Sequence, residues 1–91
     1  MELVFSPDAS ANVESYRDSD PVAWSLVQPA LRAIRDEAAR AKETELRLPG
    51  GTAWSIRCQA VGIDTAYEVI WAVLGQTRIA NVVYAGPALG P

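Results

Sequence analysis

The sequence predicts an α+β fold of order β-α-α-β-β-β, in which two N-terminal helices pack on one face of a small, mostly antiparallel sheet. Apolar residues follow helical spacing up to residue 41, and they alternate with polar residues after Lys42. Turn residues separate these segments at regular places. A chain of 91 residues has room for one core, so we expect residues 1–91 to form a single domain.

Two capping signals place the predicted helices. Ser6-Pro7 follows the apolar stretch LVF at residues 3–5, and Asp20-Pro21 follows the first helical segment. A short polar residue before proline is a common helix start, so we expect helices from about 7 to 17 and from 21 onward. The second helix has the stronger apolar stripe: Trp24, Val27, Leu31, Ile34, Ala38 and Ala41. Pro29 interrupts this stripe, which predicts a kink there or a restart near Gln28.

The second half of the chain has the spacing of strands. ELRL at 45–48, AWSIRCQA at 53–60 and AYEVIW at 66–71 are separated by turn residues, and Gly75-Gln76 suits a tight hairpin before the last strand. Pairing across residues 62–65 is expected to set 54 opposite 73, 56 opposite 71 and 58 opposite 69. The face toward the helices would then carry Trp54, Ile56, Cys58, Val69, Trp71 and Val73, with Cys58 as inert packing. The other face would be half apolar and would carry Ser55, Arg57, Gln59, Glu68, Ile70, Ala72, Ile79, Asn81 and Val83.

Composition excludes several kinds of chemistry. The chain has no histidine and one cysteine, which excludes histidine general-base catalysis, a Cys/His nucleophile and any zinc site built on histidine or several thiolates. We therefore expect neither a cofactor nor a metal. The net charge of -3 does not suggest a protein that coats nucleic acid. No uncharged apolar run approaches the ~20 residues of a membrane span, so a cytoplasmic protein without membrane contact is expected.

Four segments in order, LVFSPDA, WSIRCQAVG, AYEVIW and GQTRIANVVYAG, resemble the RelE/ParE superfamily of toxins from type II toxin-antitoxin pairs. The resemblance implies that basic residues of its ribonucleases hold the scissile phosphate while a tyrosine or similar group handles protons. Arg57 matches one family arginine, and Tyr84 lies near the end of the last strand, so these two are the candidate catalytic residues. Glu68 stands where many members have arginine, and its charge would repel the phosphate. We assign binding positions to Glu68, Arg47, Gln59 and Asn81.

The resemblance leaves three functions open. The chain is a ribosome-dependent messenger-RNA endoribonuclease, a toxin that binds DNA gyrase, or a non-toxic domain that only binds a protein partner. A cognate antitoxin is implied for the first two, and a homodimer is possible. The alternative for Arg57 and Glu68, and the one that we favour over a catalytic couple, is a solvated cross-strand pair contributing ~0 to 1 kcal/mol. We expect a toxin-like component that acts through protein binding, with a degenerate ribonuclease site; whether it is an enzyme stays open.

Overall fold

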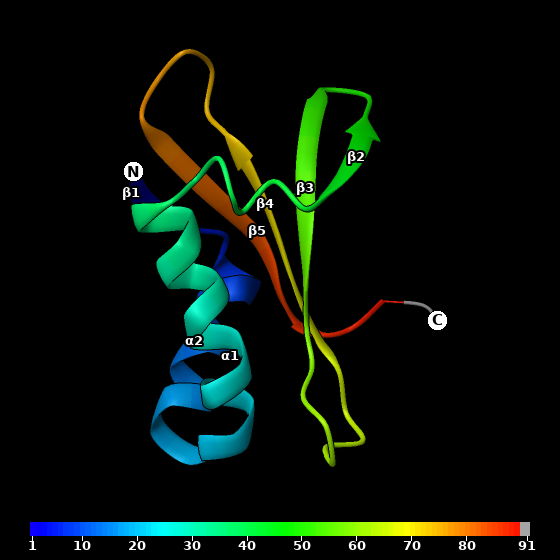
Figure 1. The fold of residues 1–91 in the computed structure, drawn as a ribbon. Helices are drawn as coiled ribbons and strands as arrows, with labels where there is room; N and C mark the ends of the chain where they lie inside the picture. The colour runs from blue at the N-terminus through cyan, green and yellow to red at the C-terminus, as the bar shows by residue number, and fades with distance from the viewer. Residues whose placement is uncertain (90–91) are drawn as a thin grey trace.

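The computed structural model describes residues 1–89 as two helices packed against one face of a five-stranded sheet (Figure 1). The elements are β1 (Glu2–Phe5), α1 (Pro7–Ser19), α2 (Pro21–Asp36), β2 (Thr44–Leu48), β3 (Gly51–Cys58), β4 (Tyr67–Val73) and β5 (Ile79–Pro87). The strand order is β1-β5-β4-β3-β2, and every neighbouring pair is antiparallel except β1 and β5, which are parallel. The predicted fold class is confirmed. The sheet has one strand more than the predicted order, because all four of the strand-like segments after Lys42 form strands.

Both helices begin where the capping signals placed them. The Ser6 side chain accepts a hydrogen bond from the Ala9 N–H at 3.3 Å, and the Asp20 carboxylate accepts one from the Ala23 N–H at 3.1 Å. Each bond satisfies one of the amide donors that a helix leaves without an internal partner at its first turn.

The predicted restart near Gln28 is wrong, because α2 continues through Pro29 as one helix. Proline removes the hydrogen bond that the Ser25 carbonyl would otherwise accept. Ser25 and Pro29 are both exposed, so water can bond this carbonyl and the cost of the interruption is small.

The core is centred on Trp71, which is 0% exposed, whereas its neighbour Ile70 is only partly buried. This difference confirms the predicted assignment of β4 side chains to the two sheet faces. The Trp71 indole Nε1 donates to the Ala41 carbonyl at 3.1 Å and so ties the connection after α2 to the core. Trp54 packs beside it with ring centroids 5.0 Å apart.

The predicted register between β3 and β4 is wrong by two residues. Trp54 lies opposite Trp71, Ile56 opposite Val69, and Cys58 opposite Tyr67. The two strands are joined by residues 59–66, a longer connection than the predicted turn. A shift of two residues leaves each side chain on its predicted face, because side chains alternate with a period of two.

A β-bulge changes which residues β5 presents on the outer face, as we call the sheet face away from the helices. Ile70 pairs with Tyr84, but the next residue, Trp71, pairs with Val82, so Val83 is the extra residue. Val83 is 38% exposed, in keeping with its predicted place on the outer face, but the bulge leaves it out of the row of paired residues. Tyr84 takes that place beside Ile70, while Asn81 lies opposite Ala72.

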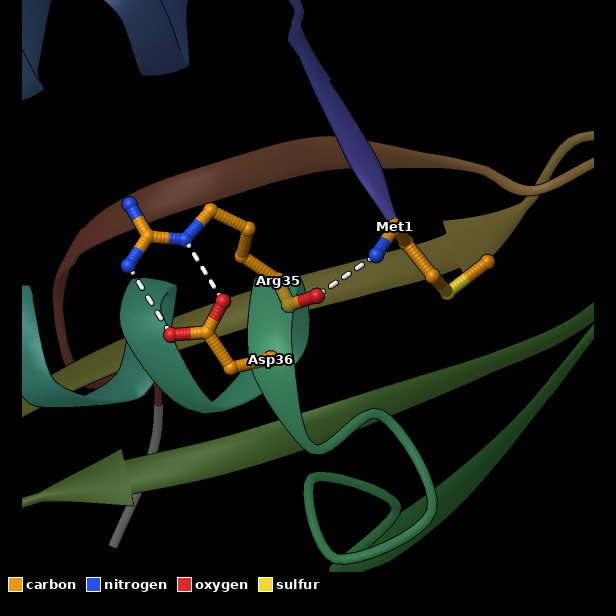
Figure 2. A network of polar contacts seen from close by, with 3 residues as sticks. All are labelled: Met1, Arg35 and Asp36. Atoms are coloured by element: carbon orange, nitrogen blue, oxygen red, sulfur yellow. Dashed lines mark hydrogen bonds and ion pairs between the residues drawn. The ribbon is translucent and has the colours of Figure 1, made fainter.

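The start of the chain is fixed against the end of α2. The Met1 ammonium donates a hydrogen bond to the Arg35 carbonyl, and the Arg35 side chain makes two hydrogen bonds with Asp36 at 2.8 and 2.9 Å (Figure 2). A cation at the C-terminal end of a helix is stabilised by the negative end of its dipole. Because β1 also pairs with β5, the first residues join the helical layer to the sheet.

Candidate functional site

The best-defined polar cluster of the outer face lies where β3, β4 and β5 run side by side. We call it the Glu68 cluster, and its members are Ser55, Arg57, Glu68 and Tyr84. Glu68 lies directly between Arg57 of β3 and Gly86 of β5. Ser55 and Tyr84 flank Ile70 in the next row of the same face. The sheet register thus brings together the two candidate catalytic residues, Arg57 and Tyr84, and the predicted binding residue Glu68.

The Glu68 carboxylate is fixed by two donors on opposite sides. The Ser55 hydroxyl donates to Glu68 Oε2, and the Leu89 N–H donates to Glu68 Oε1 at 3.0 Å. Ser55 is 6% exposed, so its hydroxyl depends on the glutamate for a partner. The segment after β5, red in Figure 1, is therefore fastened to β4 by a side chain as well as by the backbone bond from Ala88 N–H to the Ala66 carbonyl.

Arg57 and Glu68 do not form the expected ion pair, although they are direct neighbours across β3 and β4. Within residues 1–89, no ion pair joins them, and Arg57 Nε instead donates to Gln59 Oε1 at 3.3 Å. The buried Ser55 hydroxyl is close enough to hold the carboxylate, whereas the longer arginine side chain extends into water, where an exposed pair gains little. The guanidinium of Arg57 is consequently accessible to a ligand.

Tyr84 is held in a position that does not suit proton donation. Its hydroxyl donates to the Pro87 carbonyl, and burial, together with the charge of Glu68, raises its pKa above the ordinary value. A Cβ placed on Gly86 would lie 2.9 Å from Tyr84 Oη and 3.2 Å from Asn12 Nδ2. Glycine is therefore the residue that lets the phenol lie over the strand. Tyr84 stays neutral at pH 7 and is a weaker acid than a free phenol.

The remaining predicted binding residues do not all join the Glu68 cluster. Gln59 does, through its bond to Arg57. Asn81 lies in β5 opposite Ala72, farther along the outer face. Arg47 lies in the edge strand β2, on the opposite side of the sheet from Arg57, and pairs with Glu45 at 3.9 Å. Thus one of these three residues is near the candidate catalytic pair.

A cleft between α2 and β3 was not predicted from the sequence. It has a volume of 390 Å³ and is lined by Ser25, Leu26, Pro29, Ala30, Ala33, Arg40, Ala41, Glu43, Ile56, Arg57, Cys58 and Gln59. The α2 wall and the β3 wall of the cleft both carry apolar side chains at the spacing typical of a core. The sequence pattern therefore does not reveal that a cleft separates the helix from the strand here. Burial, and then the charges of Glu43 and Glu68, raise the pKa of Cys58 to about 11, so the thiol in this cleft is unreactive at neutral pH.

Neither a metal centre nor a membrane span emerges from the part of the chain that the structure describes. Residues 1–89 contain no group of three or more histidine, cysteine, aspartate or glutamate side chains arranged to hold a metal ion. No helix among them is long and apolar enough to cross a bilayer. Comparison with protein-family models, curated proteins and solved structures finds no match. The candidate site is therefore defined by its geometry.

Proposed function

We propose that this chain is a toxin-like component of a type II toxin-antitoxin system that acts by binding proteins, with an outer face that no longer serves ribonuclease chemistry. The observation that carries the proposal is the fixed carboxylate of Glu68 beside Arg57. Two hydrogen bonds hold this negative charge in the row where a phosphate would have to approach the guanidinium. Because Glu68 is the direct cross-strand neighbour of Arg57, its negative charge opposes the attraction of the guanidinium for a phosphodiester, and affinity for a phosphodiester is low.

The outer face also has the mixed character of a protein-binding surface. Ile70 lies at its centre, between Ser55 and Tyr84, and is partly exposed. Val4 of β1 is 38% exposed at the far edge. A cognate antitoxin segment that covers Ile70 would gain apolar burial there and polar contacts with Arg57 and Gln59 at the rim. DNA gyrase is the target that the resemblance implies for a member of this kind.

One observation favours the alternative of a ribosome-dependent messenger-RNA endoribonuclease. The Arg57 guanidinium makes no ion pair with Glu68, so it keeps donors for a phosphate. Against this alternative, Tyr84 is held by the Pro87 carbonyl and has a raised pKa. The proton-transfer step would then lack a suitably poised group.

Expression in a bacterial host separates these functions. Protein binding predicts growth inhibition that Arg57→Ala leaves unchanged and that the product of an adjacent small gene relieves. Ile70→Lys should abolish this relief, because the antitoxin segment is proposed to cover Ile70. Val4→Lys is the matched control, because it places the same charge on the outer face away from the Glu68 cluster. Each variant must keep the near-UV circular dichroism of the folded tryptophans.

A direct cleavage assay completes the test. Purified protein incubated with ribosomes and messenger RNA is expected to leave the RNA intact. Cleavage that Arg57→Ala abolishes would establish the ribonuclease instead. Absence of growth inhibition would point to the non-toxic interaction domain. No change in solubility or melting temperature with any neighbouring gene product would favour a protein that acts without such a partner.

A further inference from the structure

β2 is an exposed edge of the sheet with an open hydrogen-bonding side. Thr44–Leu48 pairs with β3 on one side, and no other strand of residues 1–89 pairs with its second side. Four of its five residues are exposed, and Leu46 is partly buried. An edge of this kind presents unpaired backbone groups to any extended chain that can approach it.

The hairpin geometry identifies which backbone groups face outward. Leu48 and Gly51 are partners on either side of the two-residue turn, so they form the hydrogen-bonded pair that closes the hairpin. Hydrogen-bonded and non-hydrogen-bonded pairs alternate along an antiparallel ladder. The N–H and C=O groups of Glu45 and Arg47 therefore point away from β3, toward the open side.

We propose that a second copy of this chain occupies the open side of β2, antiparallel and centred on Leu46. Residues whose N–H and C=O groups point to the open side must pair with residues of the same kind in the second copy. For two identical antiparallel β2 strands, this leaves three registers in which Glu45 or Arg47 is paired. Two of them set Glu45 against Glu45 or Arg47 against Arg47 of the second copy. The third sets Glu45 of each copy against Arg47 of the other, and both cross-strand pairs are then of opposite charge.

The other side of the strand also fits this register. Leu46 meets Leu46 of the second copy at the two-fold axis, and Leu48, which is 50% exposed, lies opposite Thr44. Glu45 and Arg47 already pair within the strand at 3.9 Å, but both side chains are exposed and can exchange this contact for one between copies. The two sheets become one continuous sheet. A contact of five residues is at the small end of specific interfaces, so the dimer forms at high protein concentration.

Charge exchange tests the register. Sedimentation of the wild-type protein is expected to show a monomer-dimer equilibrium that shifts to dimer across the micromolar to millimolar range. Glu45→Arg and Arg47→Glu should each weaken association by roughly tenfold or more, because both cross-strand pairs become like-charge pairs. The double variant Glu45→Arg/Arg47→Glu restores opposite charges and should recover the wild-type equilibrium.

Cross-linking tests the two-fold axis directly. In the proposed register, Leu46 and its copy form a non-hydrogen-bonded pair with Cα atoms about 4.5 Å apart, close enough for a disulfide. Leu46→Cys should give a covalent dimer under mild oxidation, whereas Thr44→Cys should not, because its two copies lie ~13 Å apart along the strands. The native Cys58 is buried and does not compete. A monomer at every concentration, or association unaffected by Arg47→Glu, would overturn the proposal.

Discussion

The hydrogen bond between Ser55 and Glu68 can be measured as a coupling energy. Glu68→Ala removes the acceptor of the hydroxyl of Ser55, a residue that is 6% exposed, and also releases the Leu89 N–H. Ser55→Ala removes the donor but leaves Leu89 to bond the carboxylate. The two single variants and the double variant therefore form a thermodynamic cycle around one interaction.

The expected size follows from burial. Leaving the Ser55 hydroxyl without a partner costs about 1–3 kcal/mol, since a buried polar group loses its hydrogen bond without regaining water. For a domain of this length, that corresponds to a melting temperature lower by about 5–15 °C in Glu68→Ala. Once Ser55 is alanine, removing Glu68 should cost less, and the coupling energy is expected to be about 1–2 kcal/mol.

Urea unfolding followed by tryptophan fluorescence provides the assay, because Trp71 is completely buried in the folded state. The slope of the free energy of unfolding against urea should be the same in all four proteins. Gln59→Ala serves as a control, because this exposed residue contacts Arg57 and not the carboxylate. A coupling energy below about 0.3 kcal/mol would show that the glutamate is not held by Ser55.

Three further predictions concern the core and the packing around it. Gly86→Ala should destabilise the protein by about 1–3 kcal/mol because its Cβ would lie 2.9 Å from Tyr84 Oη, and Tyr84→Ala should recover part of this loss; equal losses in both backgrounds would contradict the clash. Trp71→Phe should lower the free energy of unfolding by about 2–4 kcal/mol through a cavity and the lost bond to the Ala41 carbonyl, as measured by urea denaturation; a change below about 1 kcal/mol would refute this packing. The folded pKa of Cys58, about 11, lies above its ordinary 9.0, so the thiol's contribution to stability is complete below pH 9 and is lost as the pH rises toward 11. Thermal melts of the wild-type protein should therefore show a melting temperature that falls between pH 9 and 11, and this fall should be smaller in Cys58→Ala. The same fall in both proteins would contradict the raised pKa.

The sequence predicts the helices and the two sheet faces well because these depend on local signals. Capping side chains before proline and the spacing of Val27, Leu31 and Ile34 do not require knowledge of distant residues. The same period-two pattern cannot choose between registers that differ by two residues, since Trp54 points into the core opposite either Trp71 or Val73. Side-chain spacing alone therefore left the register undetermined.

The arrangement of the site depends on that register and is less predictable. Glu68 was expected beside Arg57 on the outer face, and that placement is observed. Its partnership with Ser55 requires the observed register, and its bond to Leu89 requires the path of the chain after β5. The bulge at Val83 has no distinct sequence signal, yet it decides that Tyr84 lies beside Ile70.

The parallel pairing of β1 with β5 bears on how the chain folds during synthesis. Ser6 donates to the Val83 carbonyl across 77 positions of sequence, so β1 finds its neighbour only after β5 has been made. Contacts of such long sequence separation close late and slow folding. On the ribosome, the helices and the β2–β3–β4 meander can form first. Residues 2–5 stay unpaired during this time, because their partner strand β5 is not yet available. Until β5 emerges from the ribosome, the nascent protein therefore exposes the side of β4 that β5 later covers.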